Sequence, residues 1–354
     1  MSRRDAILDD KEAMFAPPDV QTSGYQKTKP TKGTEKHKPL SWTPLRICII
    51  FLCIIAAFTT TLAQTDCPAS VLLALARAAA ACMSMERNQF CHGNGESVSV
   101  YHYGSIEEMP VQPGDRFDLS SILELGIGDD DAPEWNVATL QVQANLPDAE
   151  QRSATFLLFG NVYIANEVPP LPELTITSTG TLNVRALPEA DADILTTLPL
   201  RGTATANGRT QDNRWLRIVT RNNTLGWASV ENLTVDGSIS TLNVVDTAAP
   251  FLRPFQVFSL YTGADDALCD GAPESGLLIQ TPGANVPVEL TVNGVLAEVA
   301  GTVFIQAQPQ AMMTINVLNG YAEIGALGAV HYVPAGARIH IPLGEDVLVS
   351  SAPG

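Results

Sequence analysis

Apolar and polar residues follow different periods in different parts of the chain. Residues 47–65, ICIIFLCIIAAFTTTLAQT, are uncharged and mostly apolar. After Asp66 and Pro68, an N-cap residue and an early proline, residues 67–82 repeat apolar side chains at helical spacing, which predicts a helix. Its expected apolar face comprises Val71, Leu72, Leu75, Ala78, Ala79 and Cys82. From Ser97 onward alternation dominates, so most of the chain is expected to form β-strands.

The first β-rich segment lies within residues 66–168. Residues 138–146 alternate between an apolar and a polar face, as a half-buried strand does. Residues 155–164 form an apolar run with Gly160 as a bend or bulge. The proline-rich residues 168–172 then predict a stiff linker at a domain boundary. Residues 66–168 are therefore expected to form one α+β module.

A second β-rich segment lies within residues 250–350. Apolar residues alternate cleanly from Gly276 to the end of this segment. Asn293-Gly294 and Asn319-Gly320 are dipeptides typical of two-residue hairpin turns. The segment is expected to be a separate β-domain built from successive hairpins.

Residues 174–235 have the pattern of a small barrel. Five short apolar strands are expected in about 60 residues, with Asn207-Gly208 and Asn222-Asn223 as turns between them. Trp215 and Trp227 lie in apolar strands and are expected to supply bulk to the core rather than a platform for a ligand. Short strands around a compact core are typical of small β-barrels.

Charge is distributed unevenly along the chain. The 354 residues carry 21 basic and 38 acidic side chains, a net charge of −17. Residues 1–46 sum to +3 and the remainder to −20. Because such a chain repels polyanions, nucleic-acid binding is not expected. Its 45% of hydrophobic and 17% of charged residues exclude a largely disordered protein.

The apolar run at residues 47–65 is expected to anchor the protein in a membrane. As a helix its 19 residues would rise about 28 Å, close to the ~30 Å hydrocarbon core of a bilayer. Six of the seven charges between residues 20 and 46 are basic, which places the N-terminus in the cytoplasm and the C-terminus outside. The alternative is a secretory signal ending at Ala63, because residues 47–58 resemble the apolar core of a signal peptide; the protein would then be secreted.

Four cysteines follow the apolar run: Cys67, Cys82, Cys91 and Cys269. An exported region with four cysteines is expected to contain two disulfides. Cys67 and Cys82 lie about 22 Å apart along the predicted helix, beyond the ~7 Å that a disulfide spans. The remaining connectivities are Cys82 with Cys91 and Cys67 with Cys269, or Cys67 with Cys91 and Cys82 with Cys269. The first is preferred because joining Cys82 to Cys91 requires only a turn.

The sequence contains no motif that predicts catalysis. GxSxG, HExxH, SxxK, P-loop and GxGxxG patterns are absent, and the five histidines lack metal-ligand spacing. The acidic runs near residues 129–131 and 265–266 lack the D-x-[DN]-x-[DN]-G loop of a calcium site. We therefore expect no enzyme activity, no metal site and no cofactor.

Residues 174–235 closely resemble the bacterial SH3 domain family. The resemblance rests on an ordered series of short motifs, LNVR at 182–185, Gly202, Gly208-Arg209, Trp215 and Gly226-Trp227. It implies a non-catalytic module that binds cell-wall peptidoglycan or another extracellular ligand. The candidate ligand-binding residues are Asn183, Arg185, Trp215 and Trp227.

Two further resemblances concern the flanking segments. Residues 67–93, with the acidic stretch 129–135 and LLFG at 157–160, resemble an uncharacterised three-cysteine module of surface proteins from Chloroflexi-type filamentous bacteria. GTVFIQAQ, TINVLNGYAEI and VPAGARIHIP, within residues 276–343, resemble the FecR-type extracytoplasmic β-domain. The FecR family implies a domain outside the membrane, and some of its members relay signals through a transmembrane helix.

The expected protein is mainly β, with tandem small β-modules, including an SH3-like barrel, after one N-terminal transmembrane helix and a short α-helix. Its expected function is adhesion or recognition at the cell envelope, with peptidoglycan as one candidate partner. The alternative is a single-pass transmembrane sensor. The expected parts are a disordered cytoplasmic tail (1–46), a transmembrane anchor or signal segment (47–65), a Cys-containing α+β module (66–168), the SH3-like barrel (174–235) and a FecR-like β-domain (250–350).

Overall fold

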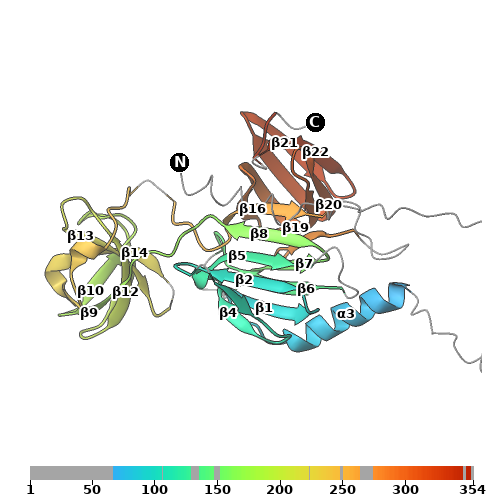
Figure 1. Ribbon diagram of the computed structural model, residues 1–354. Helices are drawn as coiled ribbons and strands as arrows, with labels where there is room; N and C mark the ends of the chain where they lie inside the picture. Colours follow the sequence, from blue (N-terminus) through green and yellow to red (C-terminus); the bar gives the residue numbers. More distant parts are fainter. Residues whose placement is uncertain are drawn as a thin grey trace, which may run out of the picture. The chain divides into compact units, whose positions relative to one another are not determined.

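The computed structural model describes residues 67–105, 107–128, 135–146, 152–222, 224–247, 250–263, 274–345 and 348–351. The predicted tail (1–46) and the predicted anchor (47–65) lie outside these ranges, as does Cys269. Within these ranges, no helix is both long and apolar enough to cross a membrane. The described part is mainly β, as the alternation predicts (Figure 1).

The predicted helix is confirmed as α3 (Cys67–Ala81). It packs beside the first strands of the large sheet through a narrow stripe of Val71, Ala74 and Ala78. Leu72, which the predicted apolar face included, is 66% exposed. The sheet covers only residues three and four apart along one side of the helix, so a neighbouring leucine stays in solvent.

Within the described ranges, fifteen strands form one curled sheet. Its N-terminal strands are β1 (Gln89–Asn94), β2 (Val98–His102), β3 (Glu108–Pro110), β4 (Arg116–Asp118), β5 (Ile122–Ile127), β6 (Val137–Val142), β7 (Ala154–Phe159) and β8 (Val162–Asn166), with the 3-10 helix η1 (Leu119–Ser121) before β5. Its C-terminal strands are β16 (Val257–Thr262), β17 (Gly276–Gln280), β18 (Val288–Val292), β19 (Val295–Ala307), β20 (Met312–Ala326), β21 (Ala329–Pro334) and β22 (Arg338–Pro342).

Strand pairing joins the two β-rich segments that the sequence analysis treated separately. β8 pairs antiparallel with β16, and β7 pairs antiparallel with β17. Phe156 of β7 and Phe258 of β16 are both buried, with ring centroids 5.6 Å apart. One continuous core therefore contains residues from both segments, and the sequence of the predicted barrel lies between β8 and β16.

Asn166 forms hydrogen bonds at the point where the chain leaves the large sheet and later returns to it. Its side chain is 3% exposed; Nδ2 donates to the Ile122 carbonyl (3.2 Å). Oδ1 accepts from the backbone N–H of Val168 (3.1 Å) and of Phe255 (3.0 Å). One buried amide thus binds both the outgoing and the returning backbone.

Two long strands, β19 and β20, are kinked together at a pair of glycines. Gly301 (φ +115°) and Gly320 (φ +78°) are register partners next to a bulge. Asn319-Gly320 therefore lies inside β20, and the predicted hairpin turn at this dipeptide is wrong. The hairpin lies at Leu327 and Gly328, between β20 and β21. The turn predicted at Asn293-Gly294 is confirmed, because these residues connect β18 to β19.

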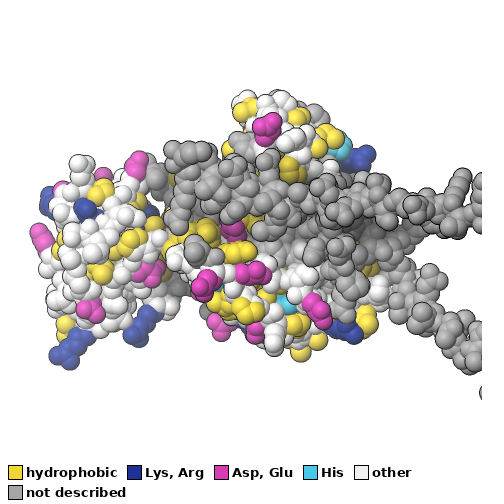
Figure 2. All heavy atoms as spheres, in the orientation of Figure 1, with side chains coloured by type: hydrophobic (Ala, Val, Ile, Leu, Met, Phe, Trp, Pro, Cys, Tyr) yellow, Lys and Arg dark blue, Asp and Glu magenta, His cyan; other side chains and the backbone are white. Residues whose placement is uncertain are grey.

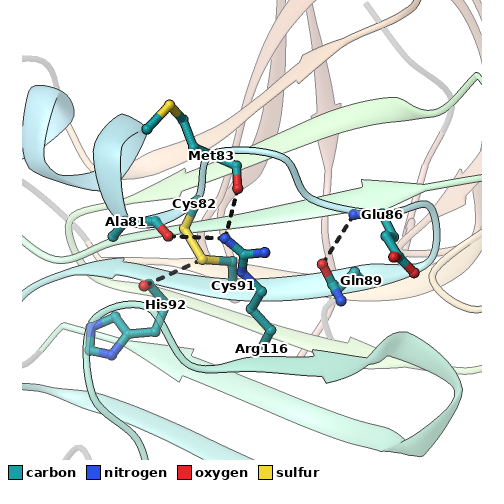
Figure 3. Close-up of a disulfide and its surroundings, with 8 residues drawn as sticks. All are labelled: Ala81, Cys82, Met83, Glu86, Gln89, Cys91, His92 and Arg116. Atoms are coloured by element: carbon teal, nitrogen blue, oxygen red, sulfur yellow. Dashed lines mark hydrogen bonds between the residues drawn. A yellow bond between two sulfur atoms is a disulfide. The ribbon is translucent and has the colours of Figure 1, made fainter.

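The structure contains the preferred disulfide, Cys82 to Cys91, which closes the end of α3 onto β1 (Figure 3). The Cα atoms of the two cysteines are 5.8 Å apart. Arg116 of β4 lies beside the disulfide and donates from Nη2 to the carbonyl oxygens of Met83 (2.7 Å) and Ala81 (3.3 Å). The turn between helix and strand is thus held by one covalent bond and one guanidinium.

Figure 3 shows His92, which follows Cys91 in β1. Its side chain is buried. Burial is the main cause that lowers the pKa of His92 below its usual 6.5. The unfolded chain therefore gains a proton near pH 6.5 while folded His92 stays neutral, so the free energy of unfolding should fall as the pH drops below 6.5. For one proton the slope is at most about 1.4 kcal/mol per pH unit.

Denaturant unfolding at pH 7.5 and pH 5.5 measures this effect in the wild type and in His92→Gln. We expect the loss of stability between these pH values to be smaller in His92→Gln. An equal loss in both proteins would show that His92 does not cause it.

A second curled sheet, called the barrel below, starts at Leu174 and ends at Val235. Among the described residues it has seven strands in the order β11-β10-β14-β13-β12-β9-β15. They are β9 (Leu174–Ser178), β10 (Leu182–Arg185), β11 (Ile194–Leu198), β12 (Thr203–Arg209), β13 (Trp215–Thr220), β14 (Leu225–Ser229) and β15 (Leu233–Val235), with the 3-10 helices η3 (Val230–Asn232) and η4 (Ile239–Thr241).

Aliphatic residues fill the barrel core, which in the described residues includes neither tryptophan. Asn207-Gly208 lies within β12 at a bulge, so the predicted turn at this dipeptide is wrong. Asn222 follows β13 in the turn to β14, as predicted. The core residues are Ile176, Leu182, Val184, Leu198, Ala204, Ala206, Leu216, Ile218, Ala228, Leu233 and Leu242.

Candidate ligand-binding face of the barrel

The four predicted binding residues lie on the outer face of the barrel wall. Successive side chains of a strand point to opposite faces. In β10, Leu182 and Val184 belong to the core, so Asn183 and Arg185 face outward. In the same way, the core residues of β13 and β14 place Trp215 and Trp227 outside.

Strand register brings three outward side chains into one row. Trp227 of β14 is paired with Arg185 of β10 on one side and with Arg217 of β13 on the other. Trp215 lies diagonally from Trp227, because its register partner is Ser229. Asn183 lies on the same face of β10 as Arg185, two residues earlier, and pairs with Thr197 of β11.

The two tryptophans differ in exposure. Trp227 is 5% exposed although it is not part of the barrel core. Trp215 is half-buried. Arg185 is also half-buried, and its Nη1 donates to the Ala192 carbonyl (2.6 Å). Trp215, Arg185 and Asn183 are therefore the predicted residues that solvent reaches.

Arg217 is the functional candidate that the sequence analysis missed. It is 7% exposed, and its Nε donates to Oδ1 of Asn207 (2.9 Å). Its guanidinium lies 4.6 Å from the ring centroid of Phe251, and the guanidinium of Arg253 lies 4.3 Å from the same centroid. Both distances are typical of cation–π contacts. Burial, and secondarily the charge of Arg253, lowers the pKa of Arg217, but a guanidinium stays protonated in proteins.

The chain that follows the barrel returns to this face. Val244 forms a parallel bridge with Arg209 at the end of β12, and the N–H of Val245 donates to the Arg209 carbonyl (2.9 Å). Gly208 permits this approach, because a Cβ at that position would lie 2.3 Å from Cγ2 of Val245. The same returning chain supplies Phe251, so the outer face is completed by residues beyond the barrel strands.

The sequence of these strands matches a known family. Residues 180–234 match the family model of the bacterial SH3 domain. No curated protein matches the chain. The match contains all four predicted binding residues and Arg217, whereas Phe251 and Arg253 follow it. Bacterial SH3 domains often bind cell-wall components.

The SH3 domain has a different balance of charge from the whole chain. Residues 174–235 carry six arginines and five acidic side chains, while the whole chain carries 21 basic and 38 acidic ones. Figure 2 shows basic and acidic side chains interspersed over the barrel strands. The domain therefore lacks the strong negative charge of the rest of the protein.

Alternation in β13 could have revealed Arg217 from the sequence. It stands between Leu216 and Ile218, both core residues, so it must share the outer face with Trp215. The contact with Phe251 gave no such signal, because it joins residues 34 positions apart across a loop.

Proposed function

We propose that the protein is a non-catalytic, extracytoplasmic binding protein held in the cell membrane by residues 47–65. Its SH3 domain would recognise a component of the cell wall or envelope, with peptidoglycan as the first candidate. The observation that carries this proposal is the outer row of Arg185, Trp227 and Arg217, with Trp215 at its solvent-exposed side. Aromatic and arginine side chains are the residue types that most often dominate binding energy.

Retention of the full-length protein on purified peptidoglycan tests this function. Trp215→Ala removes a half-exposed ring and is expected to reduce retention about tenfold, a loss of about 1.4 kcal/mol of binding free energy. Arg221→Gln, which changes an exposed arginine just after β13, serves as the control. We expect it to bind like the wild type.

Circular dichroism of each variant separates binding from folding. Trp215→Ala with an intact spectrum and weak retention supports the binding face. Wild-type protein that is not retained, or a folded Trp215→Ala that is retained equally, would contradict the proposal.

The rival proposal is a transmembrane sensor whose C-terminal β-strands report ligand occupancy to the cytoplasm. We favour adhesion because all four candidate binding residues and Arg217 lie within the SH3 domain. Deleting residues 1–40 distinguishes the two, because it should abolish signalling and leave adhesion intact.

A further inference from the structure

Arg217 is a buried cation with few protein acceptors. A guanidinium has five N–H donors. Among the described residues, the Arg217 guanidinium donates one hydrogen bond, from Nε to Oδ1 of Asn207, and forms no ion pair with a carboxylate. Buried charges are normally paired, because removing an ion from water costs several kcal/mol. The terminal nitrogens of Arg217 thus have no acceptor among the described residues.

The surroundings of Arg217 have the same sign of charge. The guanidinium of Arg253 lies against Phe251, the ring that Arg217 also contacts. Its positive charge contributes to lowering the pKa of Arg217. Arg185 lies across Trp227 in the adjacent strand. Two guanidiniums therefore lie against the ring of Phe251, and a third belongs to the register partner of Trp227, in a protein whose net charge is −17.

The aromatic rings strengthen any electrostatic contact at this place. Half-buried Phe251 lies against the Arg217 guanidinium, and the buried Trp227 is the register partner of Arg217. Charge-assisted hydrogen bonds are stronger where water is excluded. The planar fork of a guanidinium matches the paired oxygens of a carboxylate or a phosphate.

We propose that Arg217, with the positive charge of Arg253 nearby, binds a single oxyanion group, a carboxylate or a phosphate, of the ligand that the SH3 domain recognises. This inference rests on the proposed function and names the chemistry of the ligand.

Thermal unfolding of the full-length protein with inorganic phosphate or sodium acetate tests the site. Sodium chloride at equal ionic strength is the reference. At ten times the dissociation constant, the bound anion should raise the melting temperature by about 3 °C. We expect this rise in the wild type and in the control Arg221→Gln, and its loss in Arg217→Gln. A rise with phosphate alone identifies a phosphate group, and a rise with acetate alone a carboxylate.

Two results would overturn the inference. One is the absence of any rise in the wild type with either anion, and the other is an equal rise in folded Arg217→Gln. If Arg217→Gln does not fold, NMR of the wild type decides: the Nε–Hε signal of Arg217 should shift on titration with the anion that raises the melting temperature. An unshifted signal refutes the site.

The peptidoglycan assay keeps this test separate from the proposed function. Retention on peptidoglycan without a rise in melting temperature would support the proposed function and refute the oxyanion site. A rise in melting temperature without retention on peptidoglycan would support the oxyanion site and refute peptidoglycan as the ligand.

Discussion

Replacing Gly320 by alanine is expected to lower the free energy of unfolding by about 4 kcal/mol or to prevent folding. Gly320 has φ +78°, where a side chain is strained, and a Cβ there would lie 1.9 Å from the carbonyl oxygen of Ala300. That oxygen belongs to the backbone of β19 and cannot rotate away. The substitution therefore has to separate β19 from β20 at the bulge.

Denaturant unfolding measures the effect, and Gly328→Ala is its matched control. Gly328 has φ +83°, but a Cβ there would meet no atom within 4 Å. The control isolates the cost of the left-handed backbone, which is about 1 kcal/mol. Equal losses of stability in the two variants would show that the close contact with Ala300 is not responsible.

Replacing Phe156 by alanine is expected to cost about 3–5 kcal/mol, as large-to-small changes in a packed core do. The ring of Phe156 is fully buried and packs on Phe258, from a strand that is not its hydrogen-bonded neighbour. Because both β-rich segments share this core, the loss should destabilise the large sheet as a whole.

Hydrogen exchange shows which strands respond. We expect faster exchange in both β7 and β20 of Phe156→Ala, and the same pattern in Phe258→Ala. Leu318→Ala, which changes a side chain that is 58% exposed, should alter stability by about 0.5 kcal/mol or less. Two separate domains would instead give faster exchange only in the segment that carries the substitution.

Local signals in the sequence predicted the local structure well. The spacing of apolar residues behind Pro68 located α3, and the nine-residue separation of Cys82 and Cys91 favoured their disulfide. The Asn-Gly rule was correct at residue 293 and wrong at residues 207 and 319. An Asn-Gly dipeptide fits a turn and a bulge equally, so the choice depends on the partner strand.

Long-range pairing could not be predicted in the same way. Nothing in residues 154–166 indicates that β7 and β8 pair with β17 and β16, more than 90 positions later. Alternation specifies which face of a strand is buried but not which strand lies beside it. The sequence therefore predicted two separate β-domains, one on each side of the SH3 domain, where the structure has one sheet.

The candidate site was predicted in part for the same reason. Motif spacing located Asn183, Arg185, Trp215 and Trp227, and register places Arg185 beside Trp227. Trp227 is buried, as predicted, but on the outer face of the sheet and not in the aliphatic barrel core. The contact of Arg217 with Phe251 also could not be predicted, because it depends on how the chain returns after the last barrel strand.

The two connections of the SH3 domain determine how mechanical force would pass through the protein. Asn166, at the end of β8, is the register partner of Phe258, near the start of β16. Tension on the domain therefore reaches two adjacent strands at once. β8 is held on its other side by β5, and β16 by β18. The load is divided between two ladders of hydrogen bonds, whereas a domain attached by one linker would pull on a single strand.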